Sequence, residues 1–410
     1  MNIAFGDIII YIGIFITLYI TTLWLVVFEE NKNKIYKPKL KKNYPNTCII
    51  VPCFNEEKTI IKTVRSLLDL DYPKDKLEIL IVDDGSTDKT YQQAEKLLKH
   101  KQVKLFHKEN GGKWTALNYG IERTNAEFIG CLDADSFVVP DALKIVMAYF
   151  NDKNIMAVTS SLKVYQPKNI LQQFQKIEYI IMITYRKVFS WLNGLTVIPG
   201  PFSIYRKEVF EKLGLFVYGH NTEDCEMALR LQSKNWRIAN APDACVYTTT
   251  PTSLKGLQKQ RVRWYQGSVR NGWDYKFMFM NKKYEDFGLF ILPTIPLAIL
   301  TFIIMILYAL FLFVQSIINR FIAWQAIGFS FNQIVFSPNW FFINTSASFL
   351  IGFFVLILII TMFIIANKIS NEKIVFKKDF LFFIFLYSPL YLIWWLGALQ
   401  AIILKKKIRW

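Results

Sequence analysis

The chain has 410 residues, of which 53% are hydrophobic and 16% are aromatic, and its formal net charge is +17. This composition is too apolar for an ordinary soluble protein. The excess of positive charge indicates contact with anionic lipid, with a negatively charged substrate, or with both. Nucleic acid is not an expected partner, because no basic helix with interleaved aromatic residues occurs outside the flanks of the apolar segments.

Long segments without charged residues predict membrane-spanning helices. A helix needs about 20 residues to cross a hydrocarbon core about 30 Å thick. Four segments are longer than this or close to it: Ile8–Phe28, Phe287–Asn319, Phe321–Asn367 and Phe380–Leu404. Buried core helices are a weaker explanation, because a chain of this length has too little else to cover them. We therefore expect a multi-pass protein of the cell membrane, with an N-terminal transmembrane helix over residues 1–30 and a C-terminal transmembrane block over residues 286–410.

The first apolar segment and its flank predict the orientation in the membrane. The preceding MNIAFGD lacks the basic residues of a signal peptide, and no small-residue cleavage site ends the apolar run. Six lysines against two glutamates follow in EENKNKIYKPKLKK, which places the next domain in the cytoplasm by the positive-inside rule. Three C-terminal crossings would then leave the final KKKIRW outside. A fourth crossing within Phe321–Ser337, or a re-entrant last segment bent near Pro389, would remove this conflict, and both alternatives remain open.

Residues 46–250 alternate short apolar runs with amphipathic stretches. The apolar runs predict buried strands and the stretches between them predict helices. The expected strands cover 47–52, 77–84, 103–108 and 127–135, and the expected helices cover 57–68 and 88–100. This alternation predicts an α/β domain with a mostly parallel sheet covered on both faces. Ligands bind at the carboxyl ends of such strands, where the polar stretches CFNEE, DDGSTD and DADS stand.

Two later stretches, Ile170–Leu192 and Leu254–Trp273, mix aromatic and basic residues at helical spacing. Helices that lie against a membrane have this composition. Packing on the soluble domain is the alternative, and we favour the membrane interface. Residues 251–285 are accordingly expected to form an interfacial helix region. The five cysteines have no metal-ligand spacing and are expected to be core residues.

The stretch VDDGSTD follows a predicted strand and opens a predicted helix. Its simplest interpretation is a turn in which Ser86 or Thr87 caps the helix. Two successive aspartates at the end of a strand are better explained by a ligand. Asp83 or Asp84 could accept hydrogen bonds from a base or a ribose, as acidic residues do in dinucleotide-binding folds.

The stretch DADS places two carboxylates, Asp133 and Asp135, on either side of one alanine. Carboxylates this close repel each other, so a positive charge is expected nearby. A hard divalent cation such as Mg²⁺ or Mn²⁺, which needs few protein oxygens when it also binds substrate phosphates, would supply that charge. A solvated acidic turn is the alternative for an isolated pair of this kind.

Three further stretches contain candidate functional residues. GHNTEDCEMALRL begins a predicted helix near Thr222, where Asp224 either complements the helix dipole or acts as a general base. QKQRVRW contains Gln260, Arg263 and Trp264, which suit a phosphate and a sugar ring but also an interfacial helix. ENGGKWTALNYG places two glycines and Lys113 before a helix, as in phosphate-binding turns.

Together and in order, these motifs resemble those of the processive membrane synthases of glycosyltransferase family 2. In that family a GT-A domain, which is Rossmann-like, carries D-D-G-S, D-x-D, T-E-D and Q-x-x-R-W motifs. The matching stretches here are Asp83–Ser86, Asp133–Asp135, Thr222–Asp224 and Gln260–Trp264. The resemblance covers roughly Cys48 to Trp273. GGKWTALNYGI and QRVRWYQG are most similar to poly-N-acetylglucosamine, hyaluronan and chitin-type synthases.

The resemblance implies a role for each motif. Asp84 would contact the uracil or ribose of a UDP-sugar with support from Asp83, and Asp133 and Asp135 would hold Mg²⁺ or Mn²⁺ and the diphosphate. In such synthases the reaction is a single displacement that inverts the anomeric carbon from α to β. The metal and an arginine offset the charge that grows on the departing UDP.

The resemblance also implies which residues bind and activate the acceptor sugar. Asp224, with Glu223 beside it, would deprotonate the acceptor hydroxyl. Gln260, Arg263 and Trp264 would hold the diphosphate and the terminal sugar of the acceptor. These residues lie in the last two motifs of the resemblance, T-E-D and Q-x-x-R-W.

The expected function is therefore that of an inverting hexosyltransferase that polymerises a β-linked, N-acetylglucosamine-containing exopolysaccharide from a UDP-sugar and extrudes it across the membrane. A non-processive transferase that gives one sugar to a membrane lipid and a β-glucan synthase that uses UDP-glucose are the alternatives. The expected partners are the UDP-sugar, the growing polysaccharide, the lipid bilayer and, as an optional one, a small membrane accessory subunit.

Overall fold

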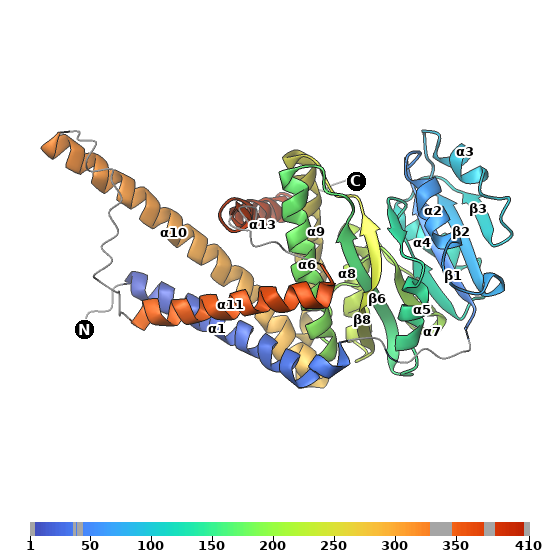
Figure 1. Cartoon of the computed structure of the whole chain (residues 1–410), viewed down its shortest axis with the longest axis horizontal. Coiled ribbons are helices and arrows are strands. Elements are labelled where there is room, and N and C mark those ends of the chain that lie inside the picture. Colours follow the sequence, from blue (N-terminus) through green and yellow to red (C-terminus); the bar gives the residue numbers. More distant parts are fainter. Residues whose placement is uncertain (1–4, 36–37, 39–43, 329–346, 373–381, 406–410) are drawn as a thin grey trace. The chain divides into compact units, whose positions relative to one another are not determined.

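The computed structural model describes residues 5–35, 38, 44–328, 347–372 and 382–405. The chain divides into two units (Figure 1). Met1–Val26 and Pro293–Ile364 form one unit, and Val27–Leu292 and Ile365–Trp410 form the other. The second unit contains the sheet and all four sequence motifs.

The described residues of the second unit form an eight-stranded sheet in the order β3-β2-β1-β4-β7-β6-β8-β5. The strands are β1 (Thr47–Cys53), β2 (Leu77–Asp83), β3 (Val103–His107), β4 (Phe128–Cys131), β5 (Ser136–Val138), β6 (Ile155–Val164), β7 (Ser203–Arg206) and β8 (Arg237–Thr248). The first four strands are mutually parallel, as expected for the predicted α/β domain. The far half of the sheet is mixed, because β7 runs antiparallel to β4 and β6, and β5 runs antiparallel to β8.

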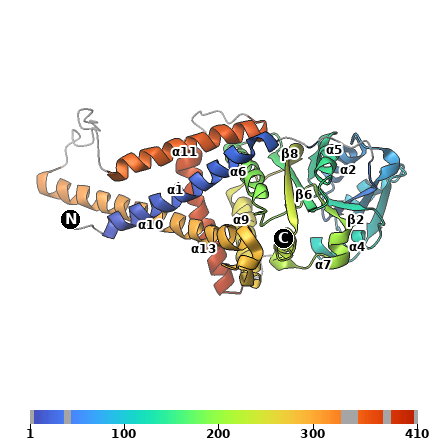
Figure 2. The same ribbon diagram turned by 90° about the horizontal axis from the view of Figure 1, so that it is seen from below.

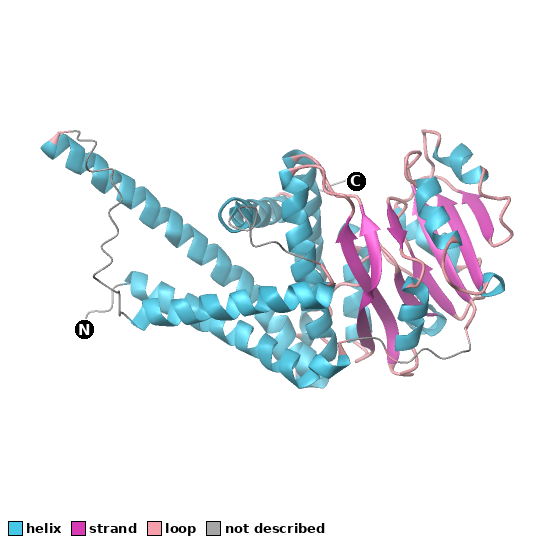
Figure 3. Ribbon diagram, in the orientation of Figure 1, coloured by secondary structure: helices cyan, strands magenta, loops and turns pink. Residues whose placement is uncertain are grey.

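Helices cover both faces of this sheet, as Figure 3 shows. Side chains of β1 alternate between the faces, as the two-residue period of a strand requires. Ile49 and Val51 join a core formed with helices α2 (Ile60–Leu68), α3 (Thr90–Glu95) and α5 (Ala142–Tyr149). Cys48 and Ile50 join a second core formed with α4 (Lys113–Ile121), α7 (Lys207–Leu213) and α8 (Glu223–Gln232). The predicted two-faced α/β architecture is therefore confirmed.

The helix predicted over residues 88–100 is shorter than expected. Only α3 is α-helical, and the chain then continues in turns closed by hydrogen bonds from Leu97 N to Ala94 O and from His100 N to Leu97 O. These bonds span three residues and tighten the end of the helix. They bring the chain round so that β3 begins at Val103.

Both stretches with mixed aromatic and basic residues form helices, α6 (Ile170–Trp191) and α9 (Leu254–Asp274). Each begins at a polar cap, because Asn169 Oδ1 accepts a hydrogen bond from Gln172 N and Ser253 Oγ accepts one from Gly256 N. α6 packs on β6 and β8, whereas α9 packs on α8 and on α13 (Ser388–Ile403). Their placement at a membrane interface stays a prediction.

Four helices are long and apolar enough to cross a membrane, in the part of the chain that the structure describes. These helical segments are Ile8–Lys34, Phe287–Ala326, Phe349–Ser370 and Phe383–Ile403. Each overlaps one predicted segment, but of the predicted Phe321–Asn367 only the later part corresponds to Phe349–Ser370, because its first residues continue the preceding helix. The helical segments include α1 (Phe5–Asn31), α10 (Leu292–Ile327), α11 (Ala347–Ser370) and α13. The alternative of a fourth crossing within Phe321–Ser337 falls partly on α10 and otherwise outside the described residues.

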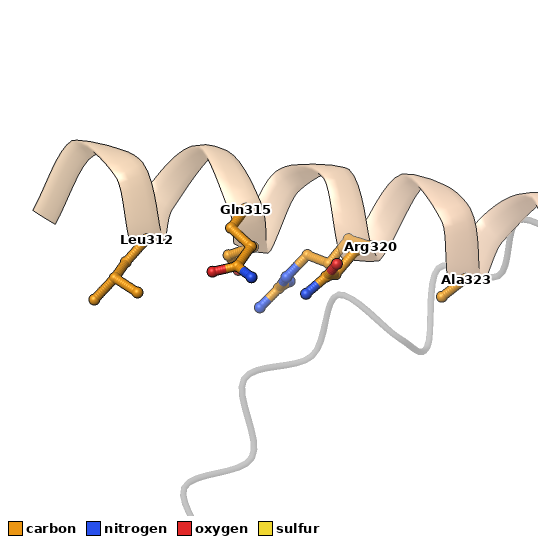
Figure 4. Close-up of a pocket in the computed structure, with 6 residues that line it drawn as sticks. Leu312, Gln315, Arg320 and Ala323 are labelled. Atoms are coloured by element: carbon orange, nitrogen blue, oxygen red, sulfur yellow. The ribbon is translucent and has the colours of Figure 1, made fainter. Parts of the chain in front are cut away.

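The first unit contains most of α1, α10 and α11, the long helices seen in Figure 2. α1 and α10 pack closely, because a side chain at Gly13 would lie 2.5 Å from Met305 Sδ. Near its end α10 has polar residues on one side, including Gln315 and Arg320 (Figure 4). Asn319 lines the same shallow pocket. The spacing of these residues, about one helical turn, makes this a polar stripe on an otherwise apolar helix.

Candidate active site

The predicted ligand-binding edge of the sheet contains a cleft of about 770 Å³. Its walls come from the ends of β1 and β2, the loop before α4, the DADS turn and the start of α8. The lining residues are Pro52, Cys53, Phe54, Glu56, Asp84, Asn110, Gly111, Gly112, Lys113, Trp114, Asp133, Ala134, Asp135, Tyr218, Asn221 and Glu223. Sequence-distant motifs therefore meet in one cleft, as expected at the carboxyl ends of parallel strands.

The two aspartates after β2 have different environments. Asp83 is fully buried, and its Oδ2 lies 2.6 Å from His107 Nδ1 on the neighbouring strand β3. Asp84 borders the cleft, and its carboxylate accepts hydrogen bonds from Lys108 Nζ (2.6 Å), Gly111 N (3.1 Å) and Gly112 N (2.8 Å). Asp84 thus fixes the paired-glycine turn. Gly112 has a φ of +90°, which favours glycine.

The loops after β1 and β2 are joined by hydrogen bonds. Asn55 N donates to Ser86 Oγ (3.0 Å), and Thr87 N donates to Asn55 Oδ1 (2.9 Å). The alternative in which Ser86 or Thr87 caps the following helix does not hold, since both side chains bind the neighbouring loop instead. Asp88 Oδ1 accepts the hydrogen bond of Thr90 N at the start of α3. These contacts hold one rim of the cleft in place.

Lys113 supplies a positive charge beside the DADS turn. Its Nζ lies 2.5 Å from Asp133 Oδ1 and 3.4 Å from Glu223 Oε1. Burial alone would lower the pKa of Lys113, but the Asp133 and Glu223 carboxylates outweigh burial and raise it, so the ammonium group stays charged. The lysine joins the D-x-D and T-E-D motifs, which lie 90 residues apart in the chain.

Asp135 lies near two other carboxylates, those of Asp133 and Glu56. It accepts hydrogen bonds from Ser136 Oγ (3.0 Å) and Thr249 Oγ1 (3.2 Å). Burial, with further contributions from Asp133 and Glu56, raises the pKa of Asp135 to about 6. A carboxyl group with a raised pKa among other carboxylates is a setting in which a bound cation would relieve the repulsion.

The donor set fits a hard divalent cation. Asp133 and Asp135 offer carboxylate oxygens at the cleft, and Mg²⁺ is usually held by one or two carboxylates together with substrate phosphates and waters. Across the described ranges, no group of three or more His, Cys, Asp or Glu residues is arranged to hold a metal by itself. Substrate oxygens and water would therefore complete the coordination shell.

The start of α8 places two more carboxylates at this end of the domain. Glu223 is buried and lines the cleft beside Lys113. Burial, and then the Glu223 charge, raise the pKa of the neighbouring Asp224 to about 6, against the opposing effect of Lys113 and Arg263. A carboxyl group that titrates near neutral pH is suited to take up a proton. Asp224 itself is not among the lining residues of the cleft.

One face of α9 packs on the loop that precedes α8. Arg263 Nη1 donates to the carbonyl oxygen of Asn221 (2.7 Å). One turn later Gly267 lies against Thr222, and two turns later Asn271 Nδ2 donates to Thr222 Oγ1 and to Gly219 O (both 2.9 Å). Arg263 is thereby brought to the edge of the cleft, because Asn221 lines it.

None of the three candidates on α9 is among the lining residues of the cleft; Arg263 binds the lining residue Asn221, whereas Gln260 and Trp264 have no such contact described. They lie one turn before Arg263 and directly after it in the helix. The Arg261 guanidinium stacks on the Trp264 ring at 4.3 Å, so this tryptophan already has a cationic neighbour. The cleft also contains Phe54, Trp114 and Tyr218, to which the sequence assigned no role. Phe54 lies in CFNEE and Trp114 in ENGGKWTALNYG, but no local signal distinguishes these aromatic side chains as lining a cleft.

Residues 48–214 match the family model described as glycosyl transferase family 2. The chain carries a family 2 glycosyltransferase domain. The predicted resemblance to this family is confirmed, and the glycosyltransferase domain contains the D-D-G-S and D-x-D motifs within the matched residues. The T-E-D motif and α9 lie beyond them.

Curated relatives of this glycosyltransferase include two proteins named poly-β-1,6-N-acetyl-D-glucosamine synthase. The one from Staphylococcus epidermidis is 28% identical over 340 residues, which cover 79% of this chain and 80% of that protein. The one from Staphylococcus aureus (strain COL) is 36% identical over 224 residues, which cover 53% of each. The chain thus matches about half the length of the Staphylococcus aureus relative.

The fold has also been seen in a solved structure. A mannosyltransferase from Pyrobaculum calidifontis, in complex with GDP-Man and Mn²⁺, superimposes with a TM-score of 0.63 over 97% of this chain and 99% of its own. The two sequences are 19% identical. This likeness confirms the GT-A-type fold predicted for the glycosyltransferase domain.

Proposed function

We propose that the protein is an inverting glycosyltransferase that extends a β-linked polysaccharide from a UDP-sugar. The observation that carries the proposal is the single cleft in which Asp84, Lys113, Asp133, Asp135 and Glu223 meet. The names of the curated relatives support a polysaccharide product and favour UDP-N-acetylglucosamine over UDP-glucose as the donor.

The donor side of the cleft is suited to a nucleoside diphosphate. Asp84 fixes the glycine turn at Gly111 and Gly112 and borders the cleft where a uracil or ribose would lie. Asp133 and Asp135 would hold Mg²⁺ or Mn²⁺, which when bound would offset the charge of the diphosphate. Lys113 already neutralises part of the charge on these carboxylates.

The acceptor side provides a base and a counter-charge for the leaving group. In a single displacement, the acceptor oxygen attacks the anomeric carbon, the bond from this carbon to the diphosphate oxygen breaks, and UDP departs. Asp224 takes the proton of the acceptor hydroxyl, since its raised pKa suits a base near neutral pH. Arg263, held on Asn221 at the edge of the cleft, stabilises the charge that develops on the departing diphosphate.

We further propose that the catalytic domain is cytoplasmic and that the polymer is extruded through the membrane. The long apolar helices support a membrane location. A polysaccharide cannot cross hydrocarbon unaided, because each unpaired hydroxyl would cost several kcal/mol. The test uses sealed vesicles with UDP-sugar supplied on one side. Product protected inside the vesicles supports extrusion, and product found wholly on the side of synthesis contradicts it.

The activity itself is tested with the purified full-length protein. UDP release is measured with UDP-N-acetylglucosamine and UDP-glucose separately, in the presence of Mg²⁺, and the products are sized. Release from UDP-N-acetylglucosamine with a ladder of products supports the proposal. A single glycolipid product would instead identify a non-processive lipid transferase. No release from either donor would contradict the proposal.

A further inference from the structure

The helix α9 is held from two opposite sides. Arg263, Gly267 and Asn271 recur at four-residue spacing on the face that contacts the loop before α8. Arg261 and Tyr265, also one turn apart, lie on the other side of the helix. That second face packs on α13 and is joined to α6 by the ion pair between Arg261 and Glu178, and both helices belong to the same unit of the structure.

A buried carboxylate on α6 is the centre of the second contact. Glu178 Oε2 accepts hydrogen bonds from Arg261 Nη2 on α9 and from Tyr387 OH (2.9 Å). Glu178 Oε1 accepts one from Tyr391 OH (2.6 Å) on α13. The side chains of Glu178 and Arg261 are only 3% and 0% exposed. One carboxylate therefore links three chain segments that are far apart in the sequence.

Aromatic rings complete the contact between α9 and α13. The Arg261 guanidinium lies 4.3 Å from the Trp264 ring centre and 5.9 Å from that of Trp394. Tyr265 stacks on Trp395 with ring centres 4.3 Å apart and an angle of 1° between the planes. The two helices also approach closely, since a side chain at Gly397 would lie 3.1 Å from Val262. The Q-x-x-R-W segment is thus held against α13 through Arg261 and Val262, and through Tyr265 directly after it.

A buried ion pair of this kind is better suited to fixing geometry than to adding stability. Removing two charges from water offsets much of their attraction, so apolar residues of the same volume would often stabilise as well. Hydrogen bonds from Arg261, Tyr387 and Tyr391, in contrast, fix the distance and direction between the helices that carry them. Glu178 Oε2 is the carboxylate oxygen that accepts the hydrogen bond of Arg261 Nη2.

We propose that Glu178 is a positioning residue that couples the candidate membrane helix α13 to Arg263 and Trp264 on α9, and so to the sugar-transfer step. The inference rests on the proposed function. Because α9 lies between α13 and the loop before α8, a shift of α13 changes the position of Arg263 at the cleft. A movement in the membrane part of this unit would in this way reach the catalytic site.

The kinetic consequence is a change in kcat rather than in donor affinity. Asp84, Asp133 and Asp135 lie on the β2 and DADS loops, which Glu178 does not contact. Arg263 acts on charge that develops only as UDP departs. Loss of an interaction made in the transition state lowers kcat and leaves KM unchanged. A displacement of about 1 Å at such a group can lower the rate about 10²-fold.

The test compares Glu178→Gln and Tyr391→Phe with the wild-type full-length protein. The matched control is Glu78→Gln. Like Glu178, Glu78 forms an ion pair, with Lys104 Nζ (2.7 Å), and accepts a hydrogen bond from a hydroxyl group, Thr124 Oγ1 (2.6 Å). It lies on β2, away from α9. The kcat and donor KM for UDP release and the thermal unfolding midpoint are measured for each protein.

We expect Glu178→Gln to lower kcat by about tenfold or more while the donor KM stays within about twofold. Tyr391→Phe should lower kcat in the same direction by a smaller factor, with an unfolding midpoint close to that of the wild type. Glu78→Gln should keep the wild-type kcat. If Glu178→Gln does not fold, Tyr391→Phe decides the question alone.

Two results would overturn the coupling. In the first, the wild-type protein is active, and both Tyr391→Phe and folded Glu178→Gln keep the wild-type kcat. The other is a loss of kcat that Glu78→Gln shows equally for the same fall in the unfolding midpoint. A wild-type protein that releases no UDP would contradict the proposed function, and this outcome is distinguishable from both.

Discussion

Replacement of Gly267 by alanine tests how tightly α9 must sit on the catalytic loop. A Cβ atom at Gly267 would lie 2.1 Å from Thr222 Oγ1 and 2.6 Å from Thr222 Cγ2. Thr222 has little freedom to turn away, because its hydroxyl donates to Gly219 O (2.9 Å) and accepts from Asn271 Nδ2 (2.9 Å). The helix and the loop must therefore separate.

The expected effect on stability is modest and the effect on activity is large. Alanine favours a helix interior over glycine by about 1 kcal/mol, whereas overpacking a tight contact costs about 1–3 kcal/mol. The free energy of unfolding should thus fall by about 2 kcal/mol or less. Glu223 and Asp224 follow Thr222 directly, so a displacement of about 1 Å there should lower kcat about 10²-fold.

Gly272 on the same helix provides the matched control. A side chain there would meet nothing within 4 Å. Gly272→Ala should therefore keep the wild-type kcat and gain up to about 1 kcal/mol of stability. Both variants are compared by thermal unfolding and by UDP release. A wild-type kcat in Gly267→Ala, or an equal loss in both variants, would refute the argument from the contact with Thr222.

Three further outcomes are expected at the cleft. Asp224→Asn should lower kcat about 10²–10⁴-fold with UDP binding retained. Wild-type kcat should fall as the pH is lowered through about 6, because burial and Glu223 raise the pKa of Asp224 to that value and a protonated carboxyl cannot act as a base. An unchanged rate in the variant would contradict both expectations. Folding raises the pKa of Asp135 from its ordinary value to about 6, so metal-free wild type should lose stability as the pH rises from that ordinary value through about 6. Asp135→Asn should not show this loss of stability. Added Mn²⁺ should raise the unfolding midpoint of wild type and leave that of Asp135→Asn unchanged. Lys113→Met should raise the donor KM in steady-state assays, since two carboxylates lose their cation; an unchanged KM would show that the lysine does not serve the donor.

The parallel half of the sheet could be predicted because local pattern and tertiary placement agree there. β1, β2 and β4 are short runs of apolar residues that are buried in the sheet, β3 is a partly buried edge strand, and each ends near a polar loop. β7, with only four residues, was not predicted as a strand, and its direction is set by pairing with β4 and β6 rather than by its own sequence. Antiparallel insertion of such a short strand leaves no periodic signal.

The residues of the candidate site could be predicted from the sequence, but the ion pairs and hydrogen bonds between them could not. The sequence indicated that Asp133 and Asp135 need a positive charge, and the structure places Lys113, 20 residues earlier, on Asp133. Nothing in local spacing predicts this ion pair, because the sheet topology brings the two loops together. The bonds of Ser86 and Thr87 to Asn55 were missed for the same reason, since they join loops that follow different strands.

The most direct test of the donor site is a structure of the protein with UDP and Mn²⁺ bound. The account predicts a metal ion beside Asp133 and Asp135, a diphosphate on that ion near Lys113, and the uridine along the wall that Asp84 borders. Nucleotide bound elsewhere, or no nucleotide in this cleft at concentrations that saturate the enzyme, would contradict it.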